Sequence, residues 1–224
     1  MNTARAVLVM SIGLGVAVAQ ARPVERAAKP GVFDFYVLAL SWSPGFCALG
    51  GKARQHAQCT DGKEHGFVVH GLWPQYEHGF PRECSMIPNS MGMRVPSRYA
   101  MSIAADIFPD QGLARHQWRM HGTCSGKTPE VYFRETARAR DVVAVPRTLQ
   151  NLRTRRLVST GEVERAFIAA NPGLEENMIA TACESGRLKE VRICLTRDLS
   201  AFRACSQVDR RGCRDHTITI DAPQ

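Results

Sequence analysis

Apolar residues gather along the chain in two kinds of pattern, one typical of strands and one typical of helices. Short runs rich in aromatic and β-branched residues, ended by glycine or proline, indicate buried strands. They predict strands at residues 33–42, 66–72, 178–182, 188–195 and 213–220, with a hairpin joining the third and fourth. Apolar positions repeated every three or four residues after a capping residue or proline indicate helices. They predict helices at 97–107, 115–121, 128–141, 146–155 and 160–171, and a polar loop at 50–63.

The order of these elements favours an α+β fold. Strands and helices do not alternate strictly, and the second half of the chain ends in strands alone. Such an order is typical of a largely antiparallel central sheet with flanking helices, and not of a doubly wound parallel sheet. The sequence after residue 31 has no repeat period, low-complexity tract or internal linker. Residues 22–224 are therefore expected to form a single domain.

The first 21 residues have the pattern of a signal peptide. A short positive segment is followed by an uncharged apolar run at 6–18 and by Ala19-Gln20-Ala21, which predicts cleavage after Ala21. The apolar run is too short to span a bilayer of roughly 30 Å, although an uncleaved anchor is the alternative. Residues 22–31 are expected to be a flexible tail. We expect a periplasmic or secreted protein that is monomeric and, after cleavage of the signal peptide, is not bound to a membrane.

Composition and cysteine count fit an exported globular protein. Hydrophobic residues make up 44% of the chain and charged residues 22%, which excludes bulk disorder, collagen and coiled coil. An even number of cysteines in an exported chain predicts up to four disulfides, and sequence alone permits 105 pairings of eight. The cysteines are Cys47, Cys59, Cys84, Cys124, Cys183, Cys194, Cys205 and Cys213. Neither Cys-x-x-Cys nor His-x-x-x-His occurs, so no metal site and no cofactor are expected.

Histidine is the residue type that points to chemistry. His70 ends a predicted buried strand, while His116 and His121 lie in one predicted helical segment, where Gln117 shares a face with His121 at i, i+4. A histidine at a strand end is most often structural. Two imidazoles together, however, suit general acid and base catalysis at a phosphodiester. RNA supplies its own 2′-hydroxyl nucleophile, and the net charge of +8 suits a polyanion.

Two segments carry a family resemblance. Gly66-Phe67-Val68-Val69-His70-Gly71-Leu72-Trp73-Pro74 resembles the first active-site segment of the ribonuclease T2 family. His116 to Cys124 resembles the second, usually written His-Glu-Trp-x-Lys-His-Gly-Thr-Cys. Tyr36 to Cys47, Ala170 to Leu174 and Glu190 to Leu195 also resemble the family. The resemblance implies an α+β endoribonuclease that cleaves single-stranded RNA through a 2′,3′-cyclic phosphate.

The resemblance also implies roles for individual residues. His121 resembles the general base for the 2′-hydroxyl, His70 the general acid for the 5′-oxygen, and His116 an auxiliary phosphate-binding histidine. Trp73 resembles the aromatic wall of a base site, with a core residue as the alternative. Gln75 and Phe80 are looser candidates for that pocket. Trp118, inside the second segment, is expected in the core.

Two positions depart from the family pattern. The family's glutamate is Gln117 here, and its lysine is Met120. Gln117 can still form hydrogen bonds, whereas Met120 offers neither charge nor donor, and one lost oxyanion-stabilising donor costs on the order of 10²–10³ in rate. Arg119 adjoins Met120 but points about 100° around a helix, so direct replacement is not expected. The sequence therefore predicts a working, slower ribonuclease, with an inactive RNA-binding relative or a partner-binding module as alternatives.

The family resemblance also implies disulfide pairings. The family joins the cysteine after its first active-site segment to the cysteine of the second, which predicts the pair Cys84–Cys124. We further predict the pairs Cys47–Cys59, Cys183–Cys213 and Cys194–Cys205.

Overall fold

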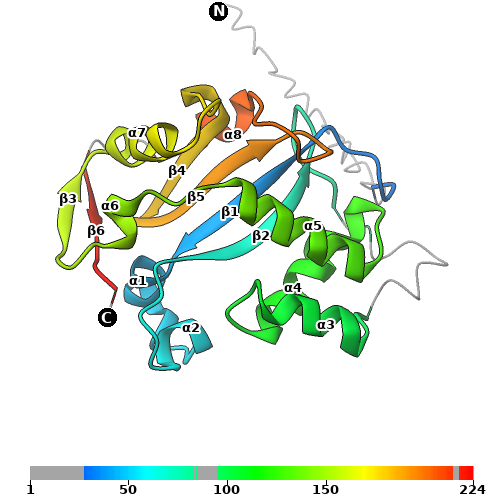
Figure 1. Cartoon of the computed structure of the whole chain (residues 1–224), viewed down its shortest axis with the longest axis horizontal. Coiled ribbons are helices and arrows are strands. Elements are labelled where there is room, and N and C mark those ends of the chain that lie inside the picture. Colours follow the sequence, from blue (N-terminus) through cyan, green and yellow to red (C-terminus); the bar gives the residue numbers. More distant parts are fainter. Residues whose placement is uncertain (1–27, 83, 85–94, 214–216, 224) are drawn as a thin grey trace, which may run out of the picture.

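The computed structural model describes residues 28–82, 84, 95–213 and 217–223 (Figure 1). The signal peptide predicted at 1–21 lies outside these residues. Only residues 28–31 of the expected tail are described, and they are hydrogen-bonded to the body of the protein. The backbone N–H of Ala28 donates to the carbonyl of Arg82 at 3.0 Å, and that of Gly31 donates to the carbonyl of Cys124 at 2.9 Å. No helix within the described ranges is long and apolar enough to cross a membrane.

A mixed sheet of six strands forms the centre of the described chain (Figure 1). Its order is β2-β1-β5-β6-β3, and β4 also pairs with β5. Every pairing is antiparallel except the short parallel contact between β5 and β6. The strands are β1 Phe35–Trp42, β2 Phe67–Gln75, β3 Arg156–Val158, β4 Ile179–Glu184, β5 Arg187–Leu195 and β6 Ile218–Ile220. The predicted α+β fold with a largely antiparallel sheet is confirmed.

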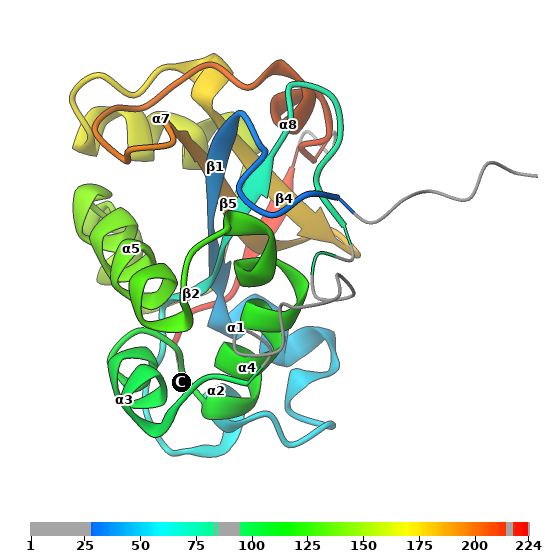
Figure 2. The ribbon, with the colours of Figure 1, turned by 90° about the vertical axis from the view of Figure 1, so that its right-hand side faces the viewer.

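The helices lie around this sheet (Figure 2), with α3, α4 and α5 grouped beside β1 and β2 and with α7 and α8 packed on β4. Ser97, Asp110, Thr128 and Ser159 each cap the first turn of a helix with a side-chain oxygen. The helices are α1 Ser43–Phe46, α2 Ala57–Thr60, α3 Arg98–Ala105, α4 Gln111–Met120, α5 Pro129–Val142, α6 Arg147–Gln150, α7 Thr160–Ala170 and α8 Ser206–Arg210. The described residues also contain a π-helical turn at Cys47–Gly51 and 3-10 turns at Gly122–Ser125 and Glu176–Met178.

Several boundaries differ from the sequence prediction. The helix expected at 146–155 is limited to α6, and residues 156–158 after it pair with β6 as strand β3, which was not predicted. The expected polar loop at 50–63 contains α2. The helix expected at 115–121 begins four residues earlier, because the Asp110 side chain accepts a hydrogen bond from the N–H of Leu113 at 2.8 Å. Strand β2 continues through Pro74, which an edge strand tolerates.

Strand β1 separates two apolar clusters because its side chains alternate between the two faces of the sheet. Tyr36, Leu38, Leu40 and Trp42 belong to the main core, which also contains Trp118 of α4. The expectation that Trp118 is a core residue is thus confirmed. Phe35 and Val37 belong to a smaller cluster on the opposite face.

Four disulfides join the eight cysteines, and their pairs are those predicted above. They are Cys47–Cys59, Cys84–Cys124, Cys183–Cys213 and Cys194–Cys205. The second connects the segment after β2 to the 3-10 turn that follows α4, so it fixes two segments that resemble the family's active site relative to each other.

Candidate active site

The candidate site is built on the face of the sheet that carries the small residues of β1. On this face Phe35 and Val37 are followed by Ala39 and Ser41, whose small side chains leave space above the sheet. Ala39 lies opposite Gly71 on β2 and Arg192 on β5, and Ser41 lies opposite Glu190 on β5. Side chains from β2 and β5, the two strands that flank β1, can therefore meet above β1.

His70 occupies a β-bulge in strand β2. The pairing passes from Ala39–Gly71 directly to Leu40–Val69, which leaves His70 as the extra residue. A bulge bends its strand and redirects the side chain of the extra residue. The imidazole consequently reaches across β1, where Nδ1 is hydrogen-bonded to Oε2 of Glu190 on β5. The His70 side chain is still 35% exposed, so the ring remains accessible from solvent.

Glu190 is a buried carboxylate between two cationic or potentially cationic partners. Glu190 is only 2% exposed, and its Oε1 accepts a hydrogen bond from Nε of Arg192 at 2.7 Å. Burial opposes ionisation, but the hydrogen bond and charge of His70, together with the charge of Arg192, outweigh it and lower the pKa of Glu190. Glu190 is therefore ionised at neutral pH and can only accept hydrogen bonds, so His70 donates from Nδ1.

Trp73 lies between two of the candidate histidines. Its ring centroid is 5.2 Å from that of His70, in an edge-on arrangement, and 5.1 Å from that of His121, in a stacked one. The indole Nε1 donates to Oε1 of Gln117 at 2.8 Å. Gln117 is 1% exposed, so this predicted catalytic residue lies beneath Trp73 and supports its ring. Gly71 permits the contact because it has no side chain beside these atoms.

His121 and His116 come from the end and the middle of α4. Burial, reinforced by the charges of His70 and His116, lowers the pKa of His121 to about 3. His121 is therefore neutral at ordinary pH and can accept a proton. His116 is exposed, and partial desolvation followed by the charges of Arg119 and His70 lowers its pKa as well. The charge of His70 thus lowers the pKa of both histidines of this segment, which places the three predicted imidazoles in one electrostatic group.

A cleft of about 670 Å³ contains two of these histidines. Its lining includes His70, His116, Arg119, Ser41, Lys189 and Glu190. We expected Arg119 to point away from the position of the family's lysine. In the structure Arg119 borders the cleft, whereas Met120 is 52% exposed and is not among the lining residues.

A smaller cavity of about 190 Å³ brings together the predicted base-site residues. Trp73, Gln75 and Phe80 all line it, together with Arg192. The guanidinium carbon of Arg192 is 5.5 Å from the centroid of Trp73, a cation–π arrangement. Arg192 and Glu190 were given no role from the sequence. The signal was present, because two oppositely charged residues at i, i+2 share one face of the strand.

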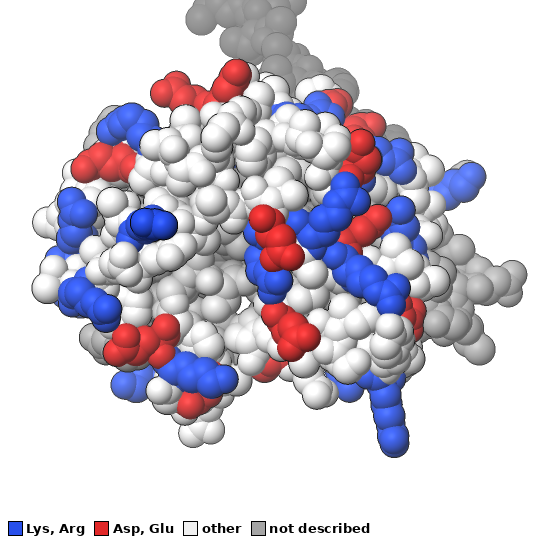
Figure 3. All heavy atoms as spheres, in the orientation of Figure 1, with Lys and Arg blue, Asp and Glu red and all other residues white. Residues whose placement is uncertain are grey.

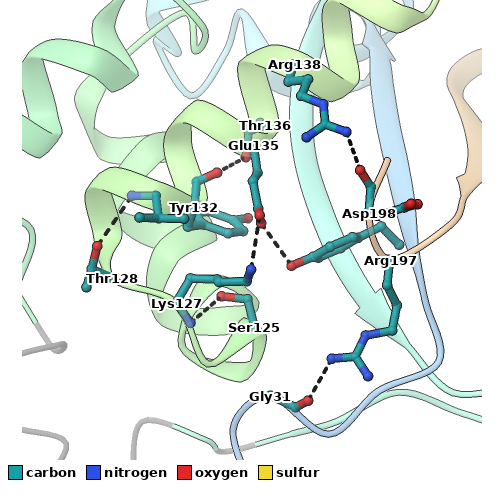
Figure 4. A network of polar contacts seen from close by, with 12 residues as sticks. Gly31, Ser125, Lys127, Thr128, Tyr132, Glu135, Thr136, Arg138, Arg197 and Asp198 are labelled. Carbon is teal, nitrogen blue, oxygen red and sulfur yellow. Dashed lines mark hydrogen bonds and ion pairs between the residues drawn. The ribbon is translucent and has the colours of Figure 1, made fainter. Parts of the chain in front are cut away.

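A polar network supports the turn that follows His121 (Figure 4). Ser125 donates its hydroxyl to the carbonyl of Gly122 at 2.6 Å. The same oxygen accepts from the N–H of Lys127 at 3.2 Å. Lys127 pairs with Glu135 of α5 at 3.2 Å, and Glu135 accepts from the hydroxyl of Tyr36 at 3.4 Å. The pKa of Tyr36 is raised by burial and by Glu135, so this hydroxyl stays a donor. The network thereby holds the His121 end of α4 against β1.

Comparison with known proteins identifies relatives of this chain. The sequence model of the ribonuclease T2 family matches residues 33–205. A ribonuclease of Aeromonas hydrophila is 38% identical over 119 residues, which cover 53% of this chain and 50% of that protein. The matched segment thus spans only half the length of that relative.

Solved structures share the fold. An RNase-related protein from Calystegia sepium superimposes with a TM-score of 0.64 at 20% identity, covering 85% of this chain and 97% of that one. RNase NT, solved in complex with 5′-AMP, gives a TM-score of 0.60 at 22% identity and covers 86% of this chain and 100% of that one. At these identities the likeness shows the fold alone. Because the family model matches well over half of the sequence, this chain belongs to the ribonuclease T2 family.

Proposed function

We propose that this protein is an endoribonuclease that cleaves single-stranded RNA by transphosphorylation, without a metal ion or other cofactor. The observation that carries the proposal is the contrast between two imidazoles on either side of Trp73. His121 is half-buried and neutral, whereas His70 donates to the ionised carboxylate of Glu190. Environments that differ in this way separate a base from an acid.

The chemistry follows from these two environments. Neutral His121 takes the proton of the 2′-hydroxyl, and the 2′-oxygen attacks phosphorus. His70 gives a proton to the 5′-oxygen as the bond between that oxygen and phosphorus breaks, which leaves a 2′,3′-cyclic phosphate. Each transfer contributes roughly 10²–10⁴ to the rate.

His116 and Arg119 are proposed to face the reacting phosphate from the α4 side of the cleft. Negative charge develops on the phosphoryl oxygens in the transition state, and fixed donors or cations at that position stabilise it. Arg119 borders the cleft together with His70 and His116. Arg119 therefore supplies the cation that Met120 lacks, which favours an active enzyme over an inactive relative.

The smaller cavity is proposed to bind the base of the nucleotide. Aromatic stacking on Trp73 and Phe80 is worth about 1–3 kcal/mol per base and tolerates any base, and Gln75 adds a side chain that both donates and accepts. RNase NT, which shares the fold, was solved with a nucleotide, 5′-AMP. We further propose that the protein acts outside the cytoplasm, since its four disulfides suit an oxidising compartment, and that it is a monomer.

A short RNA and its matched 2′-deoxy analogue test this function. The oxidised protein should cleave the RNA to cyclic-phosphate ends and leave the analogue intact. His70→Ala and His121→Ala should each lose about 10²–10⁴ in rate. His65→Ala is the matched control, because His65 pairs with Asp61 outside the cleft and should keep the wild-type rate. Binding of RNA without cleavage would instead favour the RNA-binding alternative.

A further inference from the structure

The hydrogen bond between His70 and Glu190 connects two strands that are not neighbours in the sheet. Strand β1 lies between β2 and β5, so both side chains must extend over it. The bulge at His70 and the small Ser41 on β1 make this possible. The contact is therefore a product of the sheet's register, and it joins residues 120 positions apart in the sequence.

We propose that Glu190 is a positioning residue for the general acid of RNA cleavage, and that Arg192 fixes Glu190 in turn. The proposal rests on the function proposed above. Glu190 is only 2% exposed and both of its carboxylate oxygens are already engaged, by His70 and by Arg192, so it acts through His70. As an ionised acceptor it fixes the proton on Nδ1, which leaves Nε2 as the nitrogen that can face the leaving 5′-oxygen.

Arg192 determines which carboxylate oxygen of Glu190 is left for His70. It occupies Oε1 at 2.7 Å, which leaves Oε2 for His70, and its guanidinium also lies over Trp73. A buried carboxylate held from both sides has little freedom to rotate, so the imidazole is held too. The second motif of this chain cannot supply such a group, because Gln117 is neutral and beneath Trp73 while Met120 is outside the cleft.

Other charged and titratable groups line the same cleft as the His70 ring. Lys189 comes from β5, Asp110, His116 and Arg119 from α4 and its cap, and His56 from the residue before α2. His121 lies beyond Trp73. Among these neighbours Glu190 is the group that accepts directly from His70, so its removal should change the pH profile more than removal of a distant carboxylate.

The test is the pH dependence of kcat/KM on a dinucleotide for two substitutions with opposite expected signs. Glu190→Gln keeps the shape and removes the charge. Its kcat should fall about 100-fold with KM within twofold, and its alkaline limb should move about one unit to lower pH, because protonated His70 loses its counter-charge. Arg192→Met should move that limb to higher pH, because the whole carboxylate charge then acts on His70.

A control and a spectroscopic measurement complete the test. Glu64→Gln removes an exposed carboxylate that pairs loosely with Arg153 at 3.8 Å, and its profile should match the wild type. Histidine-labelled protein should show a downfield Nδ1 proton that both Glu190→Ala and His70→Ala abolish. An unshifted limb and rate in Glu190→Gln, with active wild type, would overturn this proposal alone. An inactive wild type would overturn the proposed function, and this proposal with it.

Discussion

Gly71→Ala perturbs the point where the sheet supports the candidate site. A Cβ at this position would lie 2.2 Å from Oε1 of Gln117 and 2.4 Å from Nε1 of Trp73. These are the two atoms that form the 2.8 Å hydrogen bond beneath the cleft. Real Cβ atoms do not approach so closely, so the added methyl group must separate the pair.

The cost can be worked from two effects. Separating the pair leaves a buried amide without its partner, which costs about 1–3 kcal/mol, and forcing a methyl group into packed surroundings costs about 1–3 kcal/mol more. We expect the free energy of unfolding to fall by roughly 2–6 kcal/mol. Trp73 must move as well, and since it lies between His70 and His121, kcat/KM should fall at least tenfold.

Urea denaturation with the disulfides intact measures the first quantity, and cleavage of a dinucleotide measures the second. Gly66→Ala is the matched control, because its Cβ would meet only the ring of Trp42 at 3.4 Å, an ordinary contact. A second substitution, Gln117→Ala, should recover part of the loss in Gly71→Ala, since neighbouring changes couple. If Gly71→Ala is as stable and active as Gly66→Ala, the packing argument for this site is wrong.

Three further predictions concern the disulfide, the buried imidazole and the cleft cation. Replacing Cys84 and Cys124 with serine should lower the free energy of unfolding by about 4 kcal/mol, given their separation of 40 residues, and an unchanged urea midpoint would contradict this. His121 has its pKa lowered from 6.5 to about 3, so the unfolded chain binds the extra proton and stability falls as pH drops below 6.5. At pH 5 His121→Asn should avoid about 2 kcal/mol of that loss, and equal pH slopes in urea titrations would refute the burial effect. Arg119→Gln should lower kcat/KM at least tenfold and weaken its salt dependence, whereas Met120→Gln should keep kcat/KM within twofold of the wild type. A larger loss in Met120→Gln than in Arg119→Gln would show that Arg119 is not the cation that stabilises the transition state.

The sequence by itself determined the features that depend on neighbouring residues. The apolar runs around Leu38 and Val191 identified β1 and β5, because alternation and β-branched content are local properties. The capping residue Ser97 located a helix start for the same reason. The two histidine-bearing segments indicated the family, since motif spacing is written directly in the chain.

The weaker local signals were also where the sequence prediction erred. The helix predicted at 146–155 is limited to α6, and residues 156–158, for which no strand was predicted, pair as β3 with β6 some 60 positions later. Strand β2 passes through Pro74 because the missing N–H falls at an edge of the sheet. In both cases pairing with a distant strand outweighed the local preference.

Only the tertiary structure decided how the candidate site is assembled. The bulge that redirects His70 is set by the register between β1 and β2, and Glu190 reaches the ring because two small side chains of β1 leave space. Helix geometry suggested that Arg119 points away, yet the place of α4 against the sheet puts Arg119 at the cleft and Gln117 beneath Trp73. Register and packing depend on contacts between residues far apart in sequence, and a periodic pattern carries no information about such contacts.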